Sequence, residues 1–371
     1  APNAAAAYSL RSLTGGDPRV VRVRRVIDNA ESDFTASGVS SGALTSFVND
    51  IQTVGTAVNG TGSFDNYTVS NLSTTGFSAD NSAGGTGSAG FPYVFKDEDV
   101  LVIKYTVTNF SSTSSLSPKI RGTSSTSSAT EVTSGGTIFT ANGTYTDTLT
   151  GTSNGTHLMF ADGNTGSYTI SDFEIVSHSS NGFVETWYDQ SGNSNDAVQE
   201  TAGSQPKIVS AGTLLNELDF DGTADELAID FGADLSQANS LFMVHQSDST
   251  SSNSNDFFDR ISGSPRTLLD QSGSNYRMLS ASSVSTGVAV TTDKSLVFAL
   301  YNGASSLFAK NGTATSVLNA GTDGINQNSS LGSSGSNFYN GTMQEVIIYN
   351  SDQSSNRVAL ETNINNQYSI F

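Results

Sequence analysis

The chain has 371 residues, of which 35 are acidic and 16 basic, and its formal net charge of −19 predicts a surface that repels nucleic acid and anionic membranes. Only 14% of the residues are charged and 35% are hydrophobic, a composition rich in Ser, Thr, Gly and Asn that favours short strands joined by turns over a helical bundle. The chain has no cysteine, which excludes disulfides and thiolate chemistry, and no apolar run approaches the roughly 20 residues of a membrane span.

The first elements are predicted before residue 53. Residues 8–28 read as a pair of strands in which Val21 and Val23 alternate with Arg22, Arg24 and Arg25. These arginines are either a clamp for an acidic partner or a solvated strand face whose charges pair with nearby carboxylates. Residues 41–48 then carry apolar side chains at helical spacing, which predicts a short helix.

From about residue 58 to 180 the sequence is dominated by Ser, Thr, Gly and Asn. Its clearest strand contains Leu101, Ile103, Tyr105 and Val107 on one face, and this strand is expected to be central in a sheet. Strands are predicted at residues 67–72, 100–110, 137–140, 144–149, 157–160 and 167–176. The stretch therefore predicts a β-sandwich of its own.

Residues 183–188 alternate as a strand that contains Trp187, the only tryptophan, around which we expect a sandwich core to be arranged. A polar turn follows, from Asp189 to Asp196. Further strands are predicted at residues 227–231, 240–246, 267–269, 276–279, 295–301, 306–310 and 345–350. A closing helix is predicted over residues 351–371. Its docking face is expected to carry Val358, Leu360, Ile364 and Tyr368.

Several of these stretches resemble a known fold. Residues 187–197, 205–208 and 218–227 look like the laminin-G/concanavalin-like jelly roll, and more narrowly they are similar to the domain of family 54 α-L-arabinofuranosidases, a version of which recurs in bacteriophage virion proteins. Residues 8–13 and 20–25 match the opening of that pattern, and residues 340–349 match its end. The resemblance implies an all-β fold in which a jelly roll formed by residues 1–57 and 181–371 is interrupted by an inserted sandwich, residues 58–180.

The insert resembles β-sandwich carbohydrate-binding modules at residues 88–93 and 169–176. Such a module holds sugar on exposed aromatic rings, because the apolar face of a pyranose stacks on a ring. The carbohydrate-binding candidates are Tyr67, Phe91, Tyr93 and Phe110. The alternative for each is an ordinary core or edge aromatic residue.

The turn after Trp187 is the candidate metal site. Asp189, Asn193, Asn195 and Asp196 place side-chain oxygens at the close intervals that a calcium loop requires. Asp and Asn also build such turns without metal, by bonding to their own backbone, and that structural interpretation stays open. No other cofactor is expected. Zinc in particular is not expected, because His157, His178 and His245 lack ligand-like spacing.

No catalytic residue is assigned from the sequence. A retaining arabinofuranosidase would need two carboxyl groups about 5–5.5 Å apart across a sugar-sized pocket. The spacing of the available carboxylates pairs no two of them. These carboxylates are Glu185, Asp189, Glu217, Asp219, Asp221, Asp225, Glu226 and Glu345.

The resemblance, the missing cysteine and the acidic polar surface together predict a non-enzymatic structural protein of a bacteriophage virion. It would be a capsid decoration, head-fibre or tail-associated protein, assembled in the host cytoplasm and located on the virion surface. The expected partners are other virion proteins, host-surface glycans bound weakly and multivalently, and further copies of the chain in a homo-oligomer. The alternatives are a secreted glycoside hydrolase of arabinofuranosidase type and a bacterial surface adhesin.

Overall fold

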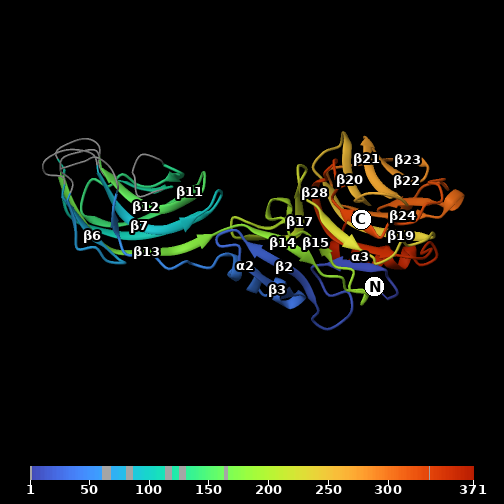
Figure 1. The fold of residues 1–371 in the computed structure, drawn as a ribbon, viewed down its shortest axis with the longest axis horizontal. Helices are drawn as coiled ribbons and strands as arrows, with labels where there is room; N and C mark the ends of the chain where they lie inside the picture. The colour runs from blue at the N-terminus through green and yellow to red at the C-terminus, as the bar shows by residue number, and fades with distance from the viewer. Residues whose placement is uncertain are drawn as a thin grey trace.

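The computed structural model describes residues 2–60, 68–80, 87–112, 119–124, 131–162, 166–333 and 335–371. Figure 1 shows two bodies built from strands, and both chain termini lie in the larger one. We call the larger body the base, residues 2–53 and 181–371, and the smaller body the insert, residues 54–180. No helix in these residues is long and apolar enough to cross a membrane.

The base is one continuous network of paired antiparallel strands that curls into a sandwich, as the sequence predicted. Its strands are β1 (Ala6–Ser9), β2 (Arg19–Arg25), β3 (Glu31–Thr35), β14 (Gly182–Trp187), β15 (Ala197–Val198), β16 (Lys207–Ser210), β17 (Thr213–Asp221), β18 (Leu227–Asp230), β19 (Asn239–Ser247), β20 (Ser252–Arg260), β21 (Thr267–Gly273), β22 (Asn275–Ser280), β23 (Ser283–Ala289), β24 (Ser295–Tyr301), β25 (Leu307–Lys310), β26 (Thr313–Ala314), β27 (Asn328–Leu331) and β28 (Asn340–Tyr349). Its helices are α1 (Ala36–Ser40), α2 (Ala43–Val48) and α3 (Arg357–Tyr368), with short 3-10 turns η1 (Ala202–Ser204) and η2 (Gly303–Ser305).

Trp187 lies in the main core of the base, fully buried at the end of β14. Its indole ring packs against the ring of Tyr8 on β1, with the two centroids 5.6 Å apart. The Tyr8 hydroxyl donates to the backbone carbonyl of Asn195 in the polar turn. The single tryptophan therefore brings together β14, the N-terminal strand and the turn that follows it.

The outer face of the base sheet is covered by α3, which explains why β19 is almost entirely buried along its length. Alternate residues of β19 point to opposite faces, so Leu241 and Met243 join the main core while Phe242 and Val244 join a second cluster under the helix. The helix contributes its own apolar side chains to this second cluster. These are Leu360, Ile364 and Tyr368, as predicted.

Val358 does not belong to the docking face of α3, which corrects the prediction. Its side chain is 63% exposed. Residues 360, 364 and 368 follow one another at intervals of four and share one side of the helix, whereas position 358 is two residues earlier and points away from that side.

The insert has two facing antiparallel sheets around a core of its own. One sheet has the order β10-β11-β8-β13-β6-β5 and the other the order β4-β7-β12-β9. The strands are β4 (Val58–Asn59), β5 (Thr68–Ser70), β6 (Phe77–Asp80), β7 (Gly87–Phe95), β8 (Val100–Ser112), β9 (Lys119–Thr123), β10 (Thr133–Gly135), β11 (Gly143–Gly151), β12 (Gly155–Asp162) and β13 (Gly166–Ser179).

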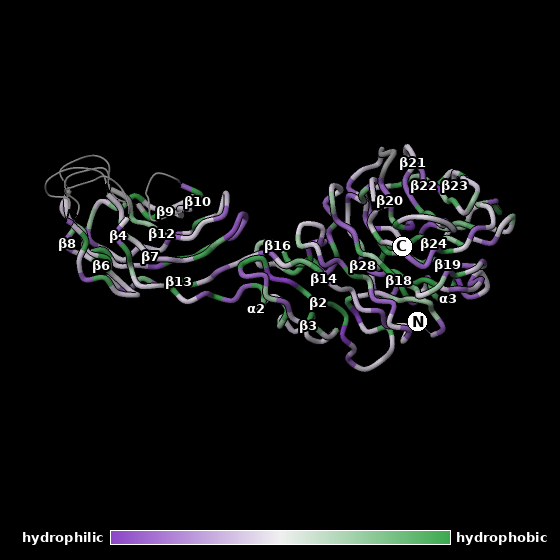
Figure 2. Tube along the Cα trace, in the orientation of Figure 1, coloured by the Kyte–Doolittle hydropathy of each residue, from purple (hydrophilic) through white to green (hydrophobic). Residues whose placement is uncertain are grey.

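Strand β8 lies between β11 and β13, so it is central as predicted. Its Leu101, Ile103, Tyr105 and Val107 side chains are all buried between the two sheets. Figure 2 shows hydrophobic and hydrophilic residues interspersed along the chain in both bodies. The core of the insert starts slightly earlier than residue 58, because Ala57 is buried in it.

Candidate functional site

A groove of about 640 Å³ lies in the base between the segment that follows β1, helix α1, the β16–β17 hairpin and the end of α3. We call it the terminal groove, because segments near both chain ends form it. Its lining consists of Leu10, Arg11, Ser12, Gly16, Asp17, Ala36, Ser37, Val39, Ser40, Leu215, Asn216, Glu217, Lys294, Gln344, Gln367 and Tyr368.

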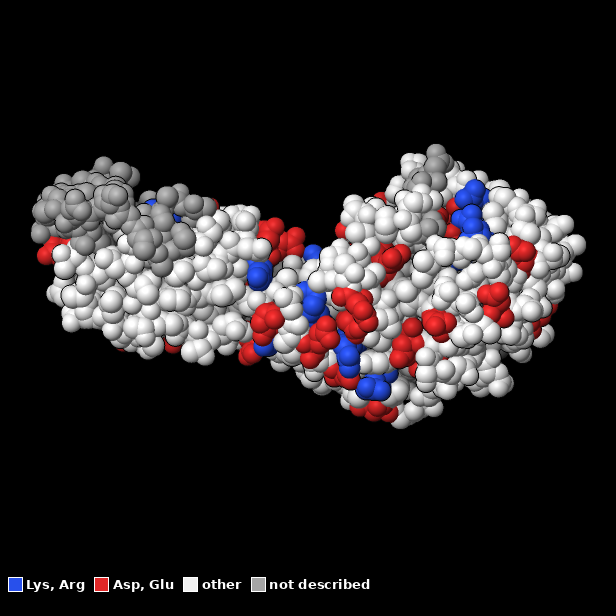
Figure 3. Space-filling model, in the orientation of Figure 1, with Lys and Arg blue, Asp and Glu red and all other residues white. Residues whose placement is uncertain are grey.

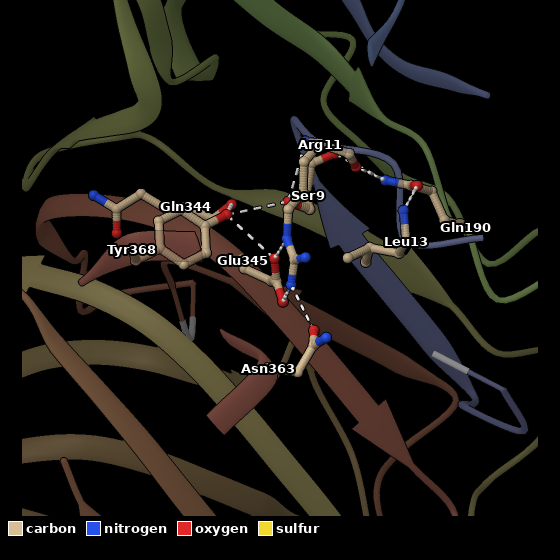
Figure 4. A network of polar contacts seen from close by, with 8 residues as sticks. All are labelled: Ser9, Arg11, Leu13, Gln190, Gln344, Glu345, Asn363 and Tyr368. Carbon is tan, nitrogen blue, oxygen red and sulfur yellow. Dashed lines mark hydrogen bonds and ion pairs between the residues drawn. The ribbon is translucent and has the colours of Figure 1, made fainter. Parts of the chain in front are cut away.

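An ion pair between Arg11 and Glu345 holds one wall of the terminal groove in place, as Figure 4 shows. Arg11 Nε donates to Glu345 Oε2 at 2.7 Å and Nη2 donates to Oε1 at 2.9 Å, which is a bidentate pair. Nη2 also lies 3.3 Å from Asn363 Oδ1 on α3. The Glu345 side chain is only 1% exposed, so its charge depends on this arginine.

Tyr368, at the end of α3, lies against the same carboxylate. Its hydroxyl is 3.2 Å from Glu345 Oε2 and 3.2 Å from Ser9 Oγ. Burial, followed by the neighbouring Glu345 charge, raises the pKa of Tyr368 above its ordinary value. A phenol with a raised pKa is a poor nucleophile, so this Tyr–Glu–Arg group fastens the C-terminal helix to the N-terminal segment and offers no activated hydroxyl.

Gln190 fixes the path of the N-terminal segment and lies to its right in Figure 4. Its Nε2 donates to the carbonyls of Ser9 and Arg11 at 2.9 and 3.0 Å, and its Oε1 accepts from the Leu13 backbone N–H at 2.8 Å. One side chain thus satisfies three backbone groups, and the wall of the groove is formed before any ligand arrives.

Lys294 and Glu217 lie next to each other in the lining of the terminal groove. The Lys294 ammonium is 4.0 Å from Glu217 Oε2 and 6.0 Å from the centre of the Tyr368 ring. Glu217 also accepts a hydrogen bond from the Gln344 amide. Their side chains are 36% and 24% exposed, so both can reach a bound molecule.

The structure corrects the predicted sugar platform of the insert. Phe91 and Tyr93 are buried, and Phe91 stacks on Phe173 with ring centroids 3.9 Å apart. Phe110 is half-buried against Phe139, and Tyr67 lies outside the described residues. A sugar cannot stack on a ring whose faces are already covered, so Phe91 and Tyr93 are core residues.

The polar turn from Asp189 to Asp196 binds backbone through the side chains that were candidates for metal. Asp189 Oδ1 accepts from the Ala7 and Ser191 N–H groups, each at 2.8 Å. Asn193 and Asn195 donate to the Ala5 carbonyl at 3.1 and 2.8 Å. Asp196 accepts from the Asp189 N–H at 2.8 Å. Among the described residues no three His, Asp or Glu side chains are grouped as metal ligands, and the geometry favours the structural turn.

Three arginines of β2 pair with carboxylates of the same chain, and the fourth, Arg24, donates to Gln205, Asn29 and the Ala202 carbonyl, so none of the four forms a free clamp. Arg19 and Arg22 both contact Asp33, at 3.0 and 2.7 Å, and Arg25 contacts Asp28 and Asp50. Figure 3 shows acidic and basic side chains next to one another on this face of the base. The Arg22 hydrogen bond, together with those from Tyr188 and Arg19, lowers the pKa of Asp33 to about 2.

The predicted carboxylates are spread over several places. Glu217 lines the terminal groove, Glu345 is the buried partner of Arg11, and Asp189 belongs to the polar turn. Asp221 accepts from the backbone of its own loop, and burial raises the pKa of nearby Asp225 to about 7. Sequence spacing therefore gave no sign that Glu217 and Arg11 would meet at one groove.

No family model and no curated protein matches the chain. Among solved structures it is similar to Trypanosoma rangeli sialidase, with 15% identity and a TM-score of 0.35, and to that enzyme with sialic acid, with 14% identity and the same TM-score. The complex with the inhibitor DANA gives 14% identity and a TM-score of 0.33. Each match covers 47% of this chain and 30% of the sialidase chain. These values carry no argument about activity, and no match supports the narrower likeness to family 54 domains. The all-β sandwich fold is what the structure confirms.

Proposed function

We propose that the protein is a non-enzymatic structural component of a bacteriophage particle, in which the base is a rigid support, the insert is held out from it, and the displayed protein makes weak, repeated contacts with glycans. One observation carries the proposal: at the junction of the two bodies, a buried polar cluster of the insert continues into partly exposed hydrogen bonds and an ion pair to the base. A secreted hydrolase needs no such projection, whereas a display protein uses a fixed spacing to let several copies bind at once.

The centre of the junction is Asp99, in the turn between β7 and β8 of the insert. Its Oδ2 lies 2.8 Å from His178 Nε2, and its Oδ1 accepts from the Ser180 hydroxyl at 2.6 Å. The other ring nitrogen of His178 is 3.0 Å from the Tyr93 hydroxyl. Asp99 and His178 are both almost fully buried. Each polar group therefore depends on the others for its partners.

The preceding residue of the same turn, Glu98, reaches the base. Glu98 Oε2 accepts from Asn181 Nδ2 at 2.7 Å and from Lys207 Nζ on β16 at 3.0 Å. Asn49, at the end of α2, accepts from the Ser180 N–H at 3.0 Å and donates to the Gly212 carbonyl at 3.1 Å. The chain leaving the base and the chain returning to it are thus bonded to each other as well as to the insert.

The junction predicts that the two bodies tumble as one. In the Glu98→Ala/Asp99→Ala double variant we expect the correlation times of the two bodies, from backbone NMR relaxation, to separate and the small-angle X-ray scattering curve to report a wider range of shapes. Glu174→Ala is the matched control, because Glu174 pairs with Lys104 at 3.3 Å on the exposed face of the insert. Independent tumbling of the unmodified protein would contradict the rigid display model.

Antibodies raised against the protein should label intact phage particles. The protein itself should sediment together with those particles through a density gradient. The purified protein is expected to release no 4-nitrophenol from an aryl α-L-arabinofuranoside. If the protein is found only in the soluble fractions of the gradient, the assignment to a particle is wrong. If the unmodified protein hydrolyses the arabinofuranoside and the Glu217→Gln variant does not, the glycosidase alternative is favoured over the display function.

A further inference from the structure

Each charged side chain of the terminal groove already lies close to a partner: Arg11 to Glu345, Lys294 to Glu217 and Asp17 to Ser37. Two cations, Arg11 and Lys294, line it together with two carboxylates, Asp17 and Glu217. A third carboxylate, Glu345, accepts hydrogen bonds from Arg11 through both of its oxygens. An anion that approached Lys294 would meet Glu217 only 4.0 Å from the ammonium group. The groove therefore does not select for a charged ligand of either sign.

The mixture of donors and acceptors fits hydroxyl groups. A sugar hydroxyl both donates and accepts, so it can accept from an ammonium group and donate to a carboxylate at the same time. Lys294 and Glu217 offer these two functions close together. Asn216 and Gln367 add amide groups to the lining, and each amide can donate and accept.

The remaining lining suits the carbon skeleton of a sugar. Leu10, Val39 and Leu215 provide apolar surface beside the polar groups. The volume of about 640 Å³ lies within the range of small-molecule sites. Several walls are already fixed: Asp17 accepts from the Ser37 N–H at 2.8 Å and holds α1, and Arg11 is held by Glu345 at 2.7 Å. A ligand would therefore spend little of its binding free energy on ordering the site.

We infer that the terminal groove is a binding site for one or two units of an uncharged saccharide, with Lys294 and Glu217 contacting its hydroxyl groups and Leu10 and Leu215 its carbon face. The inference rests on the proposed glycan contact, but it moves that contact from the aromatic residues of the insert to the base. Lys294 and Glu217 are the specificity-determining pair in this site.

The test is a fluorescently labelled protein on a printed array of neutral, uronate-containing and sialylated glycans, followed by titration of the best soluble neutral glycan. We expect binding to neutral glycans, and we expect Lys294→Met and Glu217→Gln each to weaken it roughly tenfold or more, because each variant removes a charged hydrogen-bond partner. Lys104→Met and Glu174→Gln are the matched controls, since they alter a lysine–glutamate pair on the insert. Their affinity should be unchanged.

Thermal melting of each variant distinguishes loss of the site from loss of the fold. A preference for uronate or sialylated glycans would overturn the inference, and so would equal binding by the groove variants and the unmodified protein. If neutral glycans bind and only changes in the insert weaken them, the site is misplaced while the glycan-display function stands. If no glycan binds but the protein sediments with particles, the particle assignment stands and the groove inference fails.

Discussion

Replacing Arg11 with alanine is expected to lower the free energy of unfolding by about 3–5 kcal/mol, the usual cost of leaving one member of a buried ion pair without its partner. Glu345 is 1% exposed and receives two hydrogen bonds from the Arg11 guanidinium. Without the arginine its charge would be held in a poorly solvated position beside the Tyr368 hydroxyl. Guanidinium denaturation followed by circular dichroism measures the loss.

Arg19→Ala is the matched control for this prediction. Arg19 also pairs with a carboxylate, Asp33 at 3.0 Å, but its side chain is 60% exposed. Exposed pairs contribute roughly 0–1 kcal/mol, so this variant should unfold almost as the unmodified protein does. Adding Glu345→Gln to Arg11→Ala should recover part of the loss, because it removes the stranded charge. Equal stabilities for Arg11→Ala and Arg19→Ala would contradict a role for the pair as a fastening between the two chain ends.

The second large effect is a loss of stability in acid caused by His245. Burial, with a smaller contribution from the Lys310 charge, lowers the pKa of this histidine from 6.5 to about 3. Its ring lies between the hydroxyls of Tyr339 and Tyr276, at 3.2 and 3.0 Å, and packs on Phe257. The unfolded chain takes up a proton near pH 6.5 while the folded chain does not. The stability that the neutral ring provides is therefore complete above pH 6.5 and is lost as the pH falls from 6.5 toward 3.

The size of this effect follows from the difference between the two pKa values. Through this residue alone, the free energy of unfolding should be lower by about 3 kcal/mol at pH 4 than at pH 7. We expect His245→Gln to be less stable than the unmodified protein at pH 8, because one tyrosine loses its partner, but to depend less on pH between 7 and 4. Urea denaturation across this range measures both slopes. Parallel slopes would contradict the assignment of the acid sensitivity to His245.

The sequence predicted much of the fold, because strands that pack on one side alternate in their chemistry. In β8, Leu101, Ile103, Tyr105 and Val107 all lie between the two sheets of the insert, and their spacing by two indicated a shared face. In strand β19 the alternation of residues cannot be used to predict which side chains face the core. Both of its faces are covered, one by the main core and the other by α3, so its run of apolar residues carries no alternation.

The aromatic residues of the insert show why site predictions were less accurate than fold predictions. Phe91 and Tyr93 alternate with Pro92 and Val94 on β7, so they share one face of the strand. Which face turns inward depends on the opposite sheet, where Phe173 covers Phe91 and His178 bonds to Tyr93. That information lies about 80 residues away in the chain and cannot be read from the spacing within one strand.

The terminal groove could not be predicted for a related reason. Arg11 and Glu345 are 334 positions apart, and they meet only because β1 pairs with β28 along the register Ser9 to Glu345. A single arginine near the start of an acidic chain gives no indication of its partner. The signal that was present, the scarcity of basic residues, directed attention to the arginines of β2, three of which form local ion pairs instead.

The bonding of the outgoing chain to the returning chain at Asn49 and Ser180 has a consequence for engineering. The Ser180 N–H donates to Asn49 Oδ1 at 3.0 Å, so the points where the chain leaves the base and returns to it lie side by side. A foreign polypeptide whose own ends lie equally close can be grafted there without stretching the supporting strands. The base would then serve as a scaffold whose inserted domain can be exchanged while its own β-structure stays intact.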